Sequence, residues 1–170
     1  MKKRVLLCCA ALLAFTCLSA EAADWEFSDR DRDGTYDAES AVYIQLSGDG
    51  VFIDGDGAMV EGSTITIAEE GTYVVSGTLD DGMIIVNAPD TAKLQLVLDA
   101  GESDKVQIML AGADIHCETY AALYVEEADK VFLTLAEGTQ NRLSCGAEFT
   151  LASEDDNVDA AVFSRADLTL

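Results

Sequence analysis

The segment Val125-Glu-Glu-Ala-Asp129, which runs directly into Lys130-Val-Phe-Leu-Thr-Leu135, decides the fold because its pattern recurs along the chain. It consists of an apolar strand, a polar corner and a second strand whose side chains alternate between apolar and polar, the two-residue period of β-structure. The other copies are Val86-Asn-Ala-Pro-Asp90 with Lys93-Leu-Gln-Leu-Val-Leu98, and Ser164-Arg-Ala-Asp167 with Leu168-Thr-Leu170. The three copies begin 39 residues apart, and repetition of a whole unit favours stacked coils over one closed sandwich.

A shorter echo leaves the length of one coil open. Lys93 to Ala100 resembles Lys105 to Gly112, which begins 12 residues later, so the 39-residue offset can hold one coil plus an insertion. Upstream, short alternating runs between residues 42 and 76 are separated by corners that contain glycine, which accepts a positive φ. Because no helical period is found after residue 22, the chain is predicted to be all-β, with residues 23–40 as an N-terminal cap.

The first 22 residues are predicted to be a secretory signal peptide rather than part of the fold. A basic start at residues 2–4 precedes an apolar run over residues 5–18, and Ala20-Glu-Ala22 has the small-x-small pattern of a cleavage site. Lipid attachment at Cys17 is a weaker alternative, because the two residues before it are not small. No later apolar run approaches the roughly 20 residues that a membrane helix needs. We therefore expect a secreted or cell-surface domain over residues 23–170 that does not insert into a membrane.

The charge of the chain limits its partners. Without residues 1–22 the chain holds seven Lys and Arg against 31 Asp and Glu, a net charge near −24. Nucleic acid and anionic membranes are poor partners for such a protein, because they bind through a basic footprint. Calcium, a divalent cation that prefers oxygen ligands, is instead the expected companion of so many carboxylates.

Two cysteines, Cys117 and Cys145, remain after the signal is removed. An exported protein can join them in a disulfide, which the chain-entropy model values at about 3–4 kcal/mol. The alternative is two buried thiols that pack as small apolar side chains.

The acidic segment before the first alternating run has the spacing of a calcium loop. Asp29, Asp31, Asp33 and Asp37 occupy relative positions 1, 3, 5 and 9, and Gly34 at position 6 permits the sharp turn. Position 12 lacks the bidentate Glu of such loops, however, and no helices flank the segment. A solvated acidic cap paired with the neighbouring arginines is the alternative. A second acidic stretch, residues 154–159, is interpreted as a solvated loop.

Catalytic motifs are thinly supported. His116 is the sole histidine and fits a strand, where the adjacent Cys117 points to the opposite face. The sequence contains no nucleophile elbow or phosphate-binding loop, and nothing selects a carboxylate pair for glycoside hydrolysis. Three aromatic residues, Trp25, Tyr36 and Tyr120, lie in polar contexts that suit stacking on sugar rings, whereas Tyr124 follows strand alternation and is assigned to the core or ladder.

Several strings together resemble a family of secreted bacterial carbohydrate-binding proteins. They are Phe27-Ser-Asp-Arg-Asp31 with Tyr36-Asp37, Gly62-Ser-Thr-Ile-Thr-Ile67, Glu70-Gly-Thr-Tyr-Val-Val-Ser-Gly-Thr-Leu79, and Lys130-Val-Phe-Leu-Thr-Leu-Ala-Glu-Gly-Thr139 with Asn141. The resemblance implies a right-handed parallel β-helix like that of pectate lyases. It also implies that the protein binds cellulose and acidic plant sugars, carries calcium and is not an enzyme. Asp29, Asp31 and Asp37 coincide with the opening motif, which can also serve as a cap of the helix.

Family members extend over further coils, and Leu170 lies inside the third copy of the repeat. We therefore expect the sequence to be an N-terminal fragment. A surface adhesin is the second functional hypothesis and a calcium-dependent polysaccharide lyase the third, since few basic residues are present to abstract a sugar proton.

Overall fold

The structure is a computed structural model that describes residues 29–89, 105–151, 153 and 156–170. The described chain is all-β apart from one helical turn, α1 (Asp29–Arg32). The predicted signal peptide, Trp25 and the expected strand Lys93–Leu98 lie outside the described residues. Within the described part, no helix is both long and apolar enough to cross a membrane.

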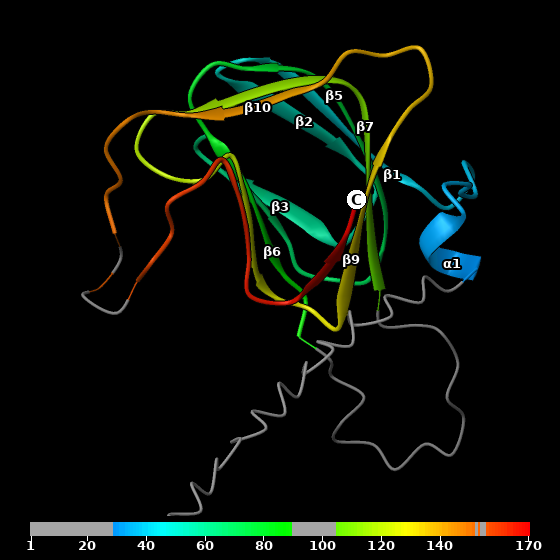
Figure 1. Cartoon of the computed structure of the whole chain (residues 1–170). Helices are drawn as coiled ribbons and strands as arrows, with labels where there is room; N and C mark the ends of the chain where they lie inside the picture. Colours follow the sequence, from blue (N-terminus) through cyan, green and yellow to red (C-terminus); the bar gives the residue numbers. More distant parts are fainter. Residues whose placement is uncertain (1–28, 90–104, 152, 154–155) are drawn as a thin grey trace, which may run out of the picture.

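The strands form two sheets that lie around a shared core (Figure 1). The larger sheet has seven strands in the order β12-β9-β7-β5-β1-β2, with β10 paired to β7. Its strands are β1 (Val42–Gly48), β2 (Gly50–Asp54), β5 (Gly71–Leu79), β7 (Lys105–Cys117), β9 (Lys130–Leu135), β10 (Arg142–Cys145) and β12 (Asp167–Thr169).

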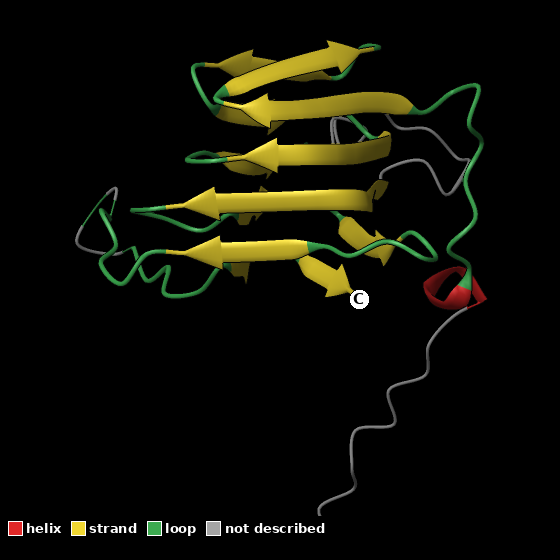
Figure 2. Ribbon diagram, turned by 90° about the horizontal axis from the view of Figure 1, so that it is seen from above, coloured by secondary structure: helices red, strands yellow, loops and turns green. Residues whose placement is uncertain are grey.

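The smaller sheet has five strands in the order β11-β8-β6-β4-β3. Its strands are β3 (Ala58–Glu61), β4 (Thr64–Ile67), β6 (Met83–Asn87), β8 (Leu123–Glu127) and β11 (Val162–Ser164). Two pairings, β1 with β2 and β3 with β4, are antiparallel, and the other described pairings are parallel. Figure 2 shows strands lying one above another, most of them with their arrows pointing the same way.

The strand register confirms the 39-residue repeat in the smaller sheet. Val86 in β6 lies beside Val125 in β8, and Val125 lies beside Ser164 in β11. In the larger sheet Lys105 lies beside Lys130, whereas Lys93 lies outside the described residues. The later of the two echoing segments lies in strand β7.

The core is built from alternate residues of both sheets. Ile44, Ile65, Ile84, Ile108 and Val125 are at most 1% exposed and belong to one buried cluster. Burying each such side chain contributes about 1.5–3 kcal/mol relative to leaving it in water. The period of two that the sequence displays is thus the period with which side chains enter this core.

A bulge interrupts the pairing of the two longest strands, β5 and β7. The register shifts between Val75 and Gly77, and the β7 strand accommodates the extra residue near Gly112. The side-chain oxygen of Asn141 accepts hydrogen bonds from the backbone N–H groups of Gly112 and Ala113, at 2.9 and 2.8 Å. A side chain from a later turn therefore satisfies the donors that the bulge takes out of the ladder.

Candidate functional site

The outer face of the smaller sheet carries a group of aromatic and charged side chains, here named the Tyr124 cluster. Its members are Tyr120, Tyr124, Asp156, Phe163 and Arg165. Leu123 and Val125 point into the main core, so Tyr124 between them points to the opposite face. Phe163 in β11 lies beside Tyr124 in the parallel register, which places both rings on that face.

Tyr120 and Tyr124 pack edge to face, and Phe163 is tilted against Tyr124. The centroids of Tyr120 and Tyr124 are 5.6 Å apart at 88°, and those of Tyr124 and Phe163 are 6.3 Å apart at 44°. The guanidinium carbon of Arg165 lies 6.0 Å from the Tyr124 centroid and 5.9 Å from the Phe163 centroid. These separations suit aromatic pairing and cation–π attraction, so the cation and the rings hold one another in place.

Polar contacts tie the same side chains together. The Tyr120 hydroxyl donates to Oδ2 of Asp156 at 2.8 Å, and Nη2 of Arg165 lies 3.3 Å from Oδ1 of the same carboxylate. Nε of Arg165 donates to the Tyr124 hydroxyl at 2.9 Å. The Asp156 side chain is 5% exposed, whereas that of Arg165 is 43% exposed. A buried anion thus fixes a cation that still reaches solvent.

The surroundings of Tyr120 favour its neutral form. Burial raises the pKa of the Tyr120 hydroxyl, and the hydrogen bond to Asp156 and the charge of that carboxylate raise it further. The hydroxyl therefore stays a hydrogen-bond donor across the physiological range. For Arg165, the hydrogen bond to Tyr124 raises the guanidinium pKa, so its charge is permanent.

This arrangement has the chemistry of sugar recognition. Apolar sugar faces pack on aromatic rings, and a guanidinium binds carboxylate oxygens in a bidentate manner. Phe163 and Tyr120 are partly exposed beside the accessible cation. The cluster can therefore present a ring edge and a positive charge to one ligand.

Sequence reasoning found one member of the cluster and missed the others. Tyr120 was predicted to contact sugar, and the structure joins it to Tyr124, which was assigned to the core or ladder. The interpretation of residues 154–159 as a solvated loop is wrong for Asp156, which is buried. The signal that could have identified Asp156 is the apolar Val158 two residues later, since it indicates a segment packed on the sheet.

The four aspartates of the predicted calcium loop each have different surroundings. The Asp31 carboxylate is 7% exposed, pairs with the Lys130 ammonium and accepts a hydrogen bond from Thr169 at 3.1 Å. The Asp33 carboxylate accepts a hydrogen bond from the backbone N–H of Thr35 at 2.9 Å. The Asp37 carboxylate accepts one from the backbone N–H of Glu39 at 3.0 Å, and the Asp29 side chain is fully exposed.

These contacts decide whether the loop fits a metal ion as it stands. Among the described residues, no group of three or more His, Cys, Asp and Glu side chains is placed to hold one. Asp31 is also engaged with a cation, Lys130, that a metal would have to replace. The described contacts thus leave these aspartates separate from one another, and calcium binding at them stays a prediction.

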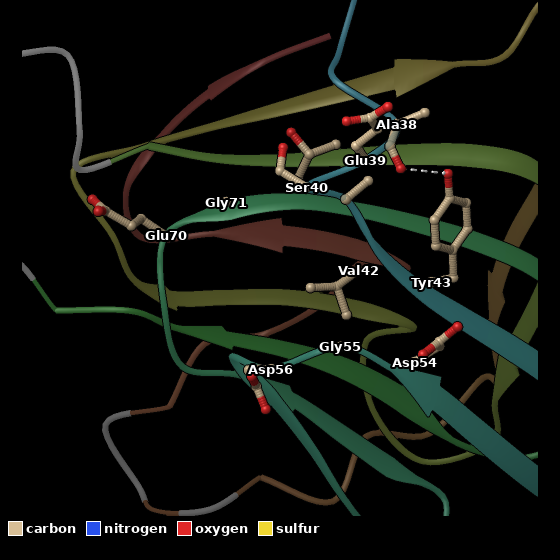
Figure 3. Close-up of a pocket in the computed structure, with 12 residues that line it drawn as sticks. Ala38, Glu39, Ser40, Val42, Tyr43, Asp54, Gly55, Asp56, Glu70 and Gly71 are labelled. Carbon is tan, nitrogen blue, oxygen red and sulfur yellow. Dashed lines mark hydrogen bonds between the residues drawn. The ribbon is translucent and has the colours of Figure 1, made fainter.

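A pocket of about 490 Å³ lies beside the start of β1 and the corners that follow β2 and β4 (Figure 3). Four acidic residues line it, namely Glu39, Asp54, Asp56 and Glu70. The Tyr43 hydroxyl donates to the Ala38 carbonyl at 3.2 Å across one side.

Tyr36, which was also predicted to contact sugar, is 38% exposed on the segment before β1. It lies on a different element from Tyr120, which precedes β8.

The two cysteines occupy neighbouring strands. Cys117 ends β7, Cys145 ends β10, and the two residues are register partners with unbonded thiols. On the opposite face, Nδ1 of His116 lies 3.0 Å from the Ser144 hydroxyl and Nε2 lies 3.0 Å from Glu118. The expectation that His116 and Cys117 face opposite ways agrees with this placement.

Comparison with known proteins places the Tyr124 cluster in a shared region. A family profile described as carbohydrate-binding domain-containing protein matches residues 61–170, which contain the cluster but exclude most of the acidic pocket. A carbohydrate-binding domain-containing protein of Acetivibrio thermocellus is 30% identical over 116 residues, covering 68% of this chain and 36% of the relative.

A solved structure is also similar. The polysaccharide lyase-like protein from C. thermocellum, studied as a gadolinium derivative, aligns with a TM-score of 0.64 and 28% identity. The alignment covers 75% of this chain and 48% of that one. The chain thus spans less than half the length of each of these two relatives.

Proposed function

We propose, from the premise that this chain belongs to the family of carbohydrate-binding domain-containing proteins, that it is a secreted, non-catalytic polysaccharide-binding protein. The observation that carries the proposal is the Tyr124 cluster, which sets aromatic rings and an accessible guanidinium together within the family-matched residues. The proposed ligands are plant cell-wall polysaccharides, namely cellulose and pectin-like acidic chains.

The proposed scaffold is a right-handed parallel β-helix with an N-terminal cap. Parallel pairing of β4, β6, β8 and β11 on one side, and of β1, β5, β7 and β9 on the other, supports successive coils. Such a scaffold offers long regular outer faces on which an extended chain of sugars can lie. The antiparallel hairpins at the start would then serve as part of the cap.

The choice between neutral and acidic sugars rests on charge. The whole chain has a formal net charge of −22, which repels a polyuronate. Arg165 offers one fixed positive charge to a sugar carboxylate, and divalent calcium bridging protein and sugar carboxylates is a second proposed route. Cellulose needs neither, since its rings can pack on Tyr120 and Phe163.

Binding by Arg165 is tested with Arg165→Ala in pull-down assays on polygalacturonate and on cellulose. We expect polygalacturonate affinity to fall about tenfold, which corresponds to about 1.4 kcal/mol. Cellulose affinity should change much less. Arg142→Ala is the matched control, because Arg142 is exposed but belongs to the other sheet. Equal losses for both variants, or none, would count against the Tyr124 cluster.

Binding through calcium is tested with a chelator. If calcium bridges the carboxylates, polygalacturonate binding disappears in the chelator while cellulose binding largely survives. Equal loss or equal persistence of the two would contradict the bridging route. Persistence of polygalacturonate binding in chelator together with its loss in Arg165→Ala would assign the acidic sugar to the guanidinium.

A polysaccharide lyase is the second candidate function, because the similar solved structure is described as polysaccharide lyase-like. The measurement is release of unsaturated uronate from polygalacturonate, followed by its ultraviolet absorbance. We expect no release. A surface adhesin, the remaining candidate, would show the protein on intact cells without affinity for any of these polysaccharides.

A further inference from the structure

We propose that Cys117 and Cys145 form a disulfide bond that fastens β10 to β7 once the protein reaches an oxidising compartment. The proposal is independent of sugar binding, since neither cysteine belongs to the Tyr124 cluster.

The register of the two strands supplies the geometry. Cys145 in β10 is the direct register partner of Cys117 in β7, and the strands run parallel. Neighbouring strands lie about 4.8 Å apart, and disulfides join residues whose Cα atoms are about 4.4–6.8 Å apart. Register partners in parallel strands also point their side chains to the same face. The register therefore meets both requirements of a disulfide between neighbouring strands.

The bond would reinforce a weak element. β10 is four residues long, and among the described strands it pairs with β7 alone. The contacts that hold it include the His116–Ser144 hydrogen bond on the outer face, the hydrogen bond from the Gly146 N–H to the Cys117 carbonyl, at 3.0 Å each, and the packing of Leu143 on the core. A covalent link on the inner face would fix the strand from both sides.

The burial of the thiols sets the order of the reaction. Cys117 is buried, and burial raises the pKa of its thiol, whereas Cys145 is partly exposed. The Cys145 thiolate would attack the disulfide of an oxidised dithiol oxidase, forming a mixed disulfide and releasing one oxidase thiolate. Cys117 then gives up its proton and displaces the second oxidase sulfur. Two protein thiols lose two electrons and two protons, and the oxidase disulfide gains them.

The bond is tested by peptide mapping of the full chain after export from a bacterial host, with free thiols blocked by iodoacetamide before unfolding. Trypsin cleaves after Lys105, Lys130, Arg142 and Arg165, so the two cysteines fall in separate peptides, 106–130 and 143–165. We expect one linked pair, lighter by two hydrogens than the sum, which separates on reduction. Recovery of both peptides unlinked, whether alkylated before or after unfolding, would overturn the proposal.

Thermal unfolding gives a second test through Cys145→Ala, which replaces the less buried cysteine. Reductant should lower the Tm of the exported wild type by roughly 5–10 °C. It should leave the Tm of Cys145→Ala unchanged, close to that of the reduced wild type. An equal response of both proteins, or no response of either, would show that no such bond stabilises the fold.

Discussion

At Gly77 the backbone of β5 adopts a conformation that side chains rarely tolerate. Its φ is +91°, and a Cβ atom there would lie 2.1 Å from the carbonyl oxygen of Leu46 on the neighbouring strand. The glycine thus allows β5 and β1 to approach closely beside the bulge.

Gly77→Ala should therefore destabilise the protein by about 3 kcal/mol or more, because it adds a collision with fixed backbone to the cost of positive φ. The matched control is Gly112→Ala, since Gly112 has a similar φ of +83° and open space around its missing side chain. That control should lose only about 1–2 kcal/mol. Urea denaturation of both variants measures the difference, and similar losses would contradict the close approach.

Tyr73 gives the fold a dependence on alkaline pH. Its ring is 1% exposed and its hydroxyl donates to the Glu69 carbonyl at 2.9 Å. Burial, with help from the charges of Glu69 and Glu70, raises the pKa of Tyr73 from 10.0 to about 12. Between pH 10 and about 12, the Tyr73 hydroxyl thus keeps its proton in the folded state and has lost it in the unfolded state.

The sign follows from linkage. The stabilisation is complete below pH 10 and is lost as the pH rises from about 10 to 12, by roughly 3 kcal/mol in all. Urea denaturation across this interval should show a steeper decline for the wild type than for Tyr73→Phe, which has no hydroxyl to ionise. Parallel declines would mean that Tyr73 titrates normally.

Single residues were predicted well where the period of two was enough. Alternation identified the strands whose alternate residues enter the core, but it does not say what covers the outer face. Tyr124 alternates like a ladder residue, and its importance arises because residues 156–165 return to pack on it. Such long-range contacts follow from loop paths that local sequence does not encode.

At the level of elements, the sequence predicted the register of β6, β8 and β11 through the 39-residue offset. It did not predict which of two echoing segments joins the larger sheet. Lys93–Leu98 and Lys105–Leu110 have almost the same pattern; the second pairs with β9, and the first lies outside the described residues. Local propensity gives the same prediction for two equal patterns, so it does not assign strand partners.

The N-terminal segment is attached to the larger sheet through Asp31. Asp31→Ala should lower the free energy of unfolding by about 2 kcal/mol, because it leaves the partly buried Lys130 ammonium without its carboxylate. The segment before β1 should also become more sensitive to protease. Urea denaturation and limited proteolysis measure these effects, and Asp29→Ala, at a fully exposed position, should change neither.

Calcium separates two roles for Asp31. If Asp31 acts only as the partner of Lys130, Asp31→Ala should lower the free energy of unfolding by the same amount in chelator as in calcium. A cost that is present in calcium and absent in chelator would make Asp31 a metal ligand and support the predicted calcium loop.

For the molecule as a whole, the period and the repeat predicted an all-β protein correctly, and the resemblance of several strings identified its family of carbohydrate-binding proteins. The net charge of −22 is the property most open to experiment at this scale. Repulsion among the carboxylates opposes the compact state, and salt screens it over a Debye length of about 10 Å at 0.1 M.

Raising sodium chloride from about 0.01 to 0.5 M should therefore raise the Tm by a few degrees. Magnesium and calcium chlorides at matched ionic strength separate screening from specific binding. Equal effects of the two divalent ions indicate screening, whereas a larger rise with calcium alone indicates a selective site. A fall in Tm with sodium chloride would refute the repulsion argument.

The offsets between paired strands have a practical consequence. Val86, Val125 and Ser164 in the smaller sheet are register partners 39 residues apart, whereas Thr64 and Met83 in the same sheet are 19 apart and Lys105 and Lys130 in the larger sheet are 25 apart. Parallel pairing of the strands thus accommodates connecting segments of different lengths. Peptide tags or loops grafted at the exposed turn of residues 137–140 could grow without shifting any strand, so new binding specificities could be added there without redesigning the framework.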